Sequence, residues 1–131
     1  MKNPFKSGDQ KTYRHRVTEA DIARFESGLV HPFYATFALG RDAEWAGRLF
    51  VLEMKEEGEE GIGTYLTIEH KSPALLGDDV DITATLERVE RNSVECSYEA
   101  RVGNRLIATG TTGQKILLRQ KIDQLVDSIN G

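Results

Sequence analysis

Residues 37–57, FALGRDAEWAGRLFVLEMKEE, decide how this chain folds. The stretch contains no proline, consists mostly of residues that favour helices, and is followed by glycines at positions 58, 61 and 63. Because glycine commonly ends helices, the pattern predicts one long helix that stops at Gly58.

The apolar residues of this stretch lie on two sides of the predicted helix. At about 100° per residue, one stripe holds Ala43, Ala46, Gly47, Phe50, Val51 and Met54. A second apolar side holds Trp45, Leu49 and Leu52. A helix that is apolar on two sides is buried on most of its circumference, so we expect other elements to wrap it.

The residues after Gly58 alternate between apolar and polar side chains, as strands do. The alternating stretches are 62–71, 80–87, 94–102 and 106–118. A final amphipathic helix is predicted over Arg119–Asn130. Together these patterns predict an α+β domain in which one antiparallel sheet curls around one long helix. Either a partner subunit or the curled sheet itself covers the second apolar side of that helix.

The N-terminal part of the chain adds less regular elements. Residues 1–11 are polar and expected to be flexible, so we expect a single folded domain over residues 12–131. Residues 12–18 alternate enough to form a strand. Thr18 is then expected to cap a short helical stretch, EADIARFESG, whose acidic residues suit the first turn of a helix.

Composition narrows the function classes. A net charge of −4 argues against nucleic acid as a partner, and no apolar run is long enough for a membrane helix. The N-terminus lacks the apolar stretch of a signal peptide, and the lone Cys96 is expected to fill the core, which together favour a cytoplasmic protein. The histidines form no metal-binding pattern, so no metal is expected, and His31 beside Pro32 is expected in an exposed loop.

Three polar side chains interrupt the apolar pattern. His70 shares the inward side of its predicted strand, where it is either a locally satisfied histidine or a site residue. Glu44 lies at the border of the main helical stripe, between Gly40 and Gly47. Because glycine inside a helix costs about 1 kcal/mol against alanine, these two glycines indicate either a close packing contact or space for a ligand. Thr36 is either a helix cap or a substrate-binding hydroxyl.

A hydroxyl, a carboxylate and an imidazole are the parts that hydrolysis of an activated acyl group requires. A base or nucleophile attacks or activates water, and a donor stabilises the oxyanion. A carboxylate beside an apolar wall has a raised pKa, which makes it a better base near neutral pH. The spacing of Thr36, Glu44 and His70 permits these groups to converge without proving it.

The order of these residues resembles the hotdog-fold acyl-CoA thioesterases, and most closely their fluoroacetyl-CoA thioesterase branch. That branch has a threonine, a glutamate eight residues later and a histidine at the end of the next strand, which match Thr36, Glu44 and His70. The resemblance covers residues 12–118. It implies that Glu44 is the base or nucleophile, His70 its proton-transfer partner, and Thr36 a hydroxyl that acts on the thioester or positions water. It also implies a homodimer or higher oligomer with sites at the interface, and coenzyme A as part of the substrate with no other cofactor.

The chain departs from the fluoroacetyl-specific pattern at the pocket. Ser27 and Val30 stand where that branch has phenylalanines, and Gln114 stands where it has a basic residue. We therefore expect a broader short or small acyl-CoA substrate. The expected substrate-binding residues are Phe33, Tyr34, Gly40, Gly47, Gln114 and Lys115.

Two other functions remain open from the sequence. One is a hotdog enoyl-CoA hydratase or dehydratase, which also uses an acid and a histidine. The other is a non-catalytic module that binds acyl-CoA, against which the full threonine, glutamate and histidine set argues.

Overall fold

The computed structural model describes all 131 residues, and most of its elements follow the order that the sequence predicts. The N-terminal part contains β1 (Gln10–Arg16), the 3-10 helix η1 (Glu19–Asp21), β2 (Ile22–Phe25) and β3 (Gly28–Tyr34). The long helix α1 (Thr36–Met54) comes next. The C-terminal part contains β4 (Glu59–Leu66), β5 (Glu69–His70), β6 (Asp79–Glu90), β7 (Ser93–Val102), β8 (Arg105–Leu118) and α2 (Arg119–Asn130).

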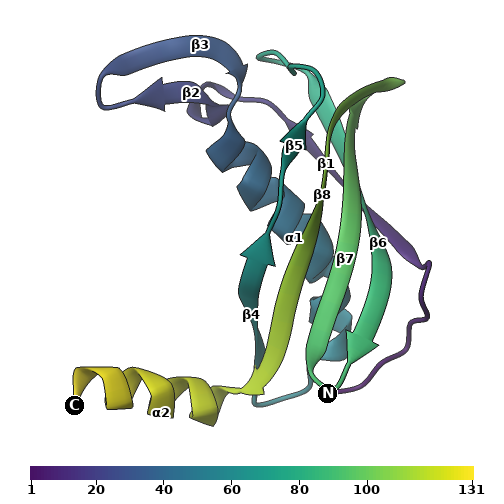
Figure 1. The fold of residues 1–131 in the computed structure, drawn as a ribbon, viewed down its shortest axis with the longest axis vertical. Helices are drawn as coiled ribbons and strands as arrows, with labels where there is room; N and C mark the ends of the chain where they lie inside the picture. Colours follow the sequence, from purple (N-terminus) through teal and green to yellow (C-terminus); the bar gives the residue numbers. More distant parts are fainter.

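An antiparallel sheet wraps around α1 (Figure 1). Its strand order is β1-β6-β7-β8-β4, and the short strand β5 pairs with β8 beyond the end of β4. The helix packs against all five strands of that order. The structure therefore confirms the α+β class and the sheet curled around one long helix.

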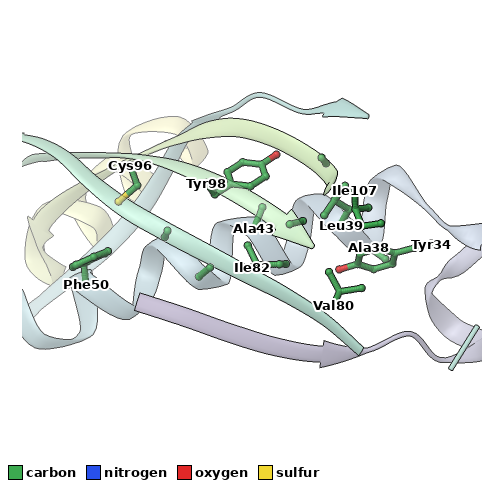
Figure 2. Close-up of a cluster of buried hydrophobic side chains, with 14 of the residues drawn as sticks. Tyr34, Ala38, Leu39, Ala43, Phe50, Val80, Ile82, Cys96, Tyr98 and Ile107 are labelled. Carbon is green, nitrogen blue, oxygen red and sulfur yellow. The ribbon is translucent and has the colours of Figure 1, made fainter. Parts of the chain in front are cut away.

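The two apolar sides of α1 differ in burial. The residues of the main stripe that have no exposed surface are Ala43, Ala46, Phe50, Val51 and Met54. Figure 2 shows Phe50 in the same apolar cluster as Ile82 and Cys96 from the facing strands. On the second side, Trp45 remains 40% exposed and Leu52 remains 39% exposed. The curled sheet does not cover this second side by itself.

The stretch EADIARFESG is not a helix, which corrects the prediction for residues 19–28. Only η1 is helical, and the chain then enters the β2–β3 hairpin. The chain reverses at Glu26 and Ser27, and β3 then begins at Gly28, whose φ of +110° is a conformation that residues with side chains rarely adopt. The hairpin forms a two-stranded sheet of its own and extends beyond the first turn of α1 (Figure 1). The buried Ile22 and Ala23 anchor it, so backbone pairing and burial outweigh the weak helical pattern.

Two element boundaries also differ from the prediction. The strand β1 begins at Gln10, so the sheet includes two residues of the stretch 1–11 that was expected to be flexible. The helix α1 ends at Met54 rather than at Glu57, because the chain turns to start β4 at Glu59. The C-terminal helix α2 has its predicted bounds, has no buried residue, and projects away from the sheet (Figure 1).

The strand predicted over residues 62–71 is interrupted at Thr67. The Thr67 carbonyl oxygen accepts a hydrogen bond of 2.6 Å from the Tyr98 hydroxyl. A Cβ atom on Gly110 would lie only 2.0 Å from that oxygen, so glycine is needed where the chain crosses β8. Pairing with β8 resumes at β5, and this displaced strand carries His70 to the start of α1.

Candidate functional site

Two of the proposed site residues meet at the start of α1. Thr36 is the first residue of the helix, and its Oγ1 atom lies 2.9 Å from Nε2 of His70 on β5. Both residues are exposed, so a ligand can reach them. A hydroxyl in hydrogen-bond contact with an imidazole is suited to proton transfer, because the ring nitrogen can accept or return the hydroxyl proton.

The Thr36–His70 pair lies on the wall of a cavity of about 720 Å³. The β2–β3 hairpin, the first turn of α1 and the segment after β5 line this cavity, which we call the acyl cavity after the acyl group that the sequence leads us to expect. Two of the expected substrate-binding residues, Phe33 and Tyr34, line it. Phe25 and Phe37 add apolar surface, and their rings lie 6.0 Å apart in an edge-to-face contact. The cavity therefore combines an apolar wall with a polar hydrogen-bonded pair, as small-molecule sites commonly do.

Glu44 lies apart from this pair within one chain. Eight residues separate it from Thr36 on α1, which corresponds to about 12 Å along the helix axis. Its exposed side chain lies over Gly63 on β4, where an added Cβ atom would be 2.0 Å from Oε1. The buried Gln114 amide donates a hydrogen bond of 3.5 Å to the Glu44 carbonyl oxygen. Thus Glu44 and Gln114 form a second group that does not line the acyl cavity.

The other expected substrate-binding residues face elsewhere. A Cβ atom on Gly40 would lie 3.0 Å from Leu66, and one on Gly47 would lie 2.6 Å from the Thr112 hydroxyl. Both glycines are buried and allow close contact between α1 and the sheet. Lys115 is exposed and follows Gln114 along β8, so its side chain leaves from the opposite face of the strand. None of these three residues lines the acyl cavity.

Sequence reasoning missed His31 as a cavity residue. It is half-buried in β3 and lines the acyl cavity, whereas the sequence suggested an exposed loop. Its Nδ1 atom accepts a hydrogen bond of 3.2 Å from the Phe33 amide, so the neutral ring carries its proton on Nε2. The sequence analysis could not place His31 in the cavity because it did not predict the hairpin. Once the hairpin is known, strand pairing places His31 opposite Ala23, another cavity residue.

Several other possible chemistries have no support in the structure. Burial raises the pKa of the Cys96 thiol to about 12, which leaves it protonated and unsuited to nucleophilic attack. No group of three or more acidic, histidine or cysteine side chains is arranged to hold a metal ion. Neither helix has the length and apolar character needed to cross a membrane.

The chain is similar to known thioesterases over most of its length. Residues 17–120 match the family model described as FlK, the fluoroacetyl-CoA-specific thioesterase. A hypothetical protein of Thermus thermophilus, a thioesterase superfamily member, is 38% identical with a TM-score of 0.92, and the similarity covers 97% of this chain and 94% of that one. A hot-dog-like protein from Thermanaerovibrio acidaminovorans is 25% identical with a TM-score of 0.88, over 97% of this chain and 94% of that one.

A variant of the FlK enzyme in complex with acetyl-CoA is more distant in sequence but shares the fold. It is 21% identical with a TM-score of 0.87, over 97% of this chain and 100% of that one. No curated protein matches the chain. The structural similarities confirm the predicted hotdog fold. Because the family model covers the whole sheet after β1 and all of α1, the chain belongs to the fluoroacetyl-CoA-specific thioesterase family.

Proposed function

We propose that this protein is an acyl-CoA thioesterase that hydrolyses a short or small acyl-CoA to the free acid and coenzyme A. The observation that carries the proposal is the contact between Thr36 and His70 on the wall of the acyl cavity, in a chain of a thioesterase family. The relative that binds acetyl-CoA supports a coenzyme A thioester as the substrate. No cofactor beyond the coenzyme A of the substrate takes part.

In the proposed reaction, water adds to the thioester carbonyl and the carbon–sulfur bond breaks. Glu44 acts as the base or as the nucleophile, and His70 transfers the proton that the thiolate receives. The Thr36 hydroxyl donates to the thioester oxygen or positions the water. These roles match the chemistry of the side chains, since a carboxylate, an imidazole and a hydroxyl cover the base, the proton carrier and the donor.

The separation of Glu44 from the Thr36–His70 pair supports a homodimer whose site is shared between subunits. The strand β4 ends the sheet order and exposes Tyr65 and Leu66, which leaves an edge free to pair with a second copy. A two-fold axis at this edge would run the two α1 helices in opposite directions. We propose that this arrangement brings Glu44 of the partner subunit to Thr36 and His70 of the first. The protein is proposed to act in the cytoplasm, where a lone unpaired cysteine is stable.

Subunit mixing tests the shared site directly. The variants Glu44→Gln and His70→Ala are each expected to lose most thiol release from a panel of acyl-CoAs. When the two are unfolded together and refolded in equal amounts, half of the dimers are expected to be mixed, with one intact site of two. The mixture should therefore recover about a quarter of wild-type activity by random pairing. No recovery, or a monomeric mass by light scattering, would contradict the shared site.

The same panel decides between the alternative functions. Loss of the ultraviolet signal of an enoyl-CoA without thiol release would identify a hydratase. Saturable binding of acyl-CoA without any turnover would identify a binding module.

The variant Glu53→Gln is the matched control for Glu44→Gln, because Glu53 is also an exposed acid on α1 but does not lie beside Gly63.

A further inference from the structure

A cluster of charged side chains around two buried carboxylates occupies the base of the β2–β3 hairpin, and the proposed reaction does not use it. It consists of His15, Asp21, Arg41 and Asp42, and we call it the hairpin clamp. Asp21 is 2% exposed and Asp42 is 3% exposed. The Arg41 guanidinium bridges the two carboxylates, with contacts of 2.8 Å to Asp21 and 2.9 Å to Asp42. His15 on β1 completes the clamp through a contact of 2.7 Å to Asp21.

The clamp holds both ends of the hairpin. Asp21 directly precedes β2, and its backbone oxygen accepts a hydrogen bond of 2.8 Å from the Ala35 amide just before α1. Tyr34 is the last residue of β3, and its hydroxyl donates a hydrogen bond of 2.5 Å to Asp42 on α1. Because Arg41 and Asp42 belong to the helix, the same cluster fastens the entry and the exit of the hairpin to α1.

The rest of the hairpin has few other attachments. It does not join the main sheet. The Phe33–Leu75 bridge and a hydrogen bond from the Tyr34 amide to the Ala74 carbonyl oxygen connect it to the loop after β5, and Phe25 packs edge-to-face on Phe37. The tip residues Leu29 and Val30 are 50% and 62% exposed. The position of this cavity wall relative to Thr36 therefore depends mainly on its two clamped ends.

The polar groups of the hairpin clamp are satisfied by hydrogen bonds. Burial raises the pKa of Asp21, but hydrogen bonds from Thr18, Arg41 and His15 outweigh it, so the net pKa lies well below its usual range. Burial and the bond to Asp42 raise the pKa of Tyr34, which keeps its hydroxyl protonated and donating. No buried polar side-chain atom lacks a partner. Removing Arg41 would take away the cation that both buried carboxylates contact, which is more costly than losing a surface pair.

We propose that Asp42, with Arg41, is a positioning residue for the acyl cavity. Through Tyr34 and Asp21 it fixes the hairpin wall opposite the Thr36–His70 pair and so limits the size of the acyl group that the cavity accepts. This inference rests on the proposed thioesterase function for its kinetic consequence, although its structural part does not. Asp42 itself does not line the cavity, so any effect of changing it on substrate choice passes through the wall.

Hydrogen exchange tests the structural part without any substrate. In Asp42→Asn and in Tyr34→Phe, backbone amides of residues 22–34 are expected to exchange about tenfold faster, because a hydrogen bond to a charged group is lost. Amides of β6 and β7 should keep their wild-type protection. Tyr98→Phe is the matched control, since it loses a tyrosine hydroxyl bond that is not part of the clamp, to the Thr67 carbonyl oxygen. Unchanged exchange of residues 22–34 in both variants, or faster exchange throughout the sheet, would overturn the proposal.

Kinetics test the consequence for substrate choice. Across acyl-CoAs of increasing chain length, Asp42→Asn is expected to reduce the preference for short chains, measured as the ratio of kcat/KM values, by about tenfold. The change should lie in KM more than in kcat, because Thr36 and His70 remain in place. The double variant Tyr34→Phe/Asp42→Asn should lose no more selectivity than Asp42→Asn alone, since both changes act on the same hydrogen bond between Tyr34 and Asp42. Unaltered selectivity in an active Asp42→Asn enzyme would overturn the role of Asp42. Absence of turnover in the wild type would instead reject the thioesterase function and leave the exchange experiment to decide the clamp.

Discussion

Two histidines, His70 on β5 and His15 on β1, lie near the first turns of α1, and their surroundings are opposite. On one side, His70 is exposed and its ring contacts a single hydroxyl, that of Thr36. On the other side, the ring of His15 is mostly buried and lies 2.7 Å from Asp21, which Arg41 also contacts. The first histidine has hydrogen-bonding capacity left for a substrate, whereas the second lies in a cluster whose polar atoms are satisfied by one another. The contrast separates groups available for chemistry from groups that hold the wall of the cavity.

Replacing His70 is expected to produce the largest change in activity with the smallest change in stability. His70→Ala should lower kcat/KM by about 10²–10⁴-fold, because a general acid or base is lost. The free energy of unfolding should change by no more than about 0.5 kcal/mol, since the side chain is exposed. Thiol release and urea unfolding measure the two quantities. Glu69→Gln, on the same short strand, is the control and should change neither quantity. A large loss of stability in His70→Ala would show that His70, like His15, has a structural role.

Replacing a member of the hairpin clamp is expected to change stability more than activity. Asp21→Asn should cost about 3 kcal/mol of unfolding free energy, because the hydrogen bonds that Thr18, Arg41 and His15 make to a buried carboxylate become bonds to a neutral amide. The matched control is Asp81→Asn, which breaks a pair between Asp81 and the exposed Arg14 and should cost less than about 1 kcal/mol. Equal losses in urea unfolding for the two variants would show that burial does not distinguish the pairs.

Asp21 in the clamp should contribute part of the pH dependence of stability. Because the pKa of Asp21 is lowered in the folded state, the unfolded chain binds more protons as the pH falls below its usual carboxyl pKa of about 4. The stabilisation is thus fully present above that pH and decreases below it, by up to about 1.4 kcal/mol per pH unit for one proton. Urea unfolding between pH 6 and pH 3 measures this slope. The slope should be shallower in Asp21→Asn, and an identical slope in the two proteins would exclude Asp21 as its source.

A small change in stability is also expected in the space beside Glu44. In Gly63→Ala the new Cβ atom would meet the mobile end of the Glu44 side chain, which can move, so stability should change by less than about 1 kcal/mol. Activity should nevertheless fall, because the carboxylate leaves its position. Gly47→Ala provides the comparison: its Cβ would meet Thr112 inside the contact between helix and sheet, so it should cost about 1–3 kcal/mol. An active Gly63→Ala enzyme would argue against a role for Glu44 in that position.

Periodicity predicted the parts of the fold that bury one continuous face. The stripe from Ala43 to Met54 and the alternation in β6 and β7 depend on burial alone, and these elements formed as predicted. The prediction of a helix over residues 19–28 was wrong for the first strand of the hairpin, because EADIARFESG fits helical spacing when only the local sequence is considered. Its actual structure rests on strand pairing and on burial of Ile22 and Ala23, and it is joined to α1 by a contact between Asp21 and Arg41, twenty positions apart, that no local pattern reveals.

The candidate site was visible in the sequence only in part. The predicted continuous strand is interrupted at Thr67. Thr36 and His70 nevertheless meet, because the strand resumes as β5 at Glu69 and so includes His70. The space beside Glu44 comes from Gly63 rather than from its helical neighbours, because a helical wheel describes only one element and the approaching strand supplies the gap. Asp42 gave no signal in the sequence, where it appeared as one more charge on a helix.

The pairing of β1 with β6 has a consequence for the order of folding. Gln10 pairs with Thr85, so this edge closes a long loop, whereas β6, β7 and β8 pair as neighbours joined by tight turns. Since long loops are slower to close than short ones, we expect the β6–β7–β8 meander to form before β1 docks. His15 lies on β1, so the hairpin clamp can be completed only after that step. The acyl cavity would then be the last part of the molecule to acquire its final shape during folding.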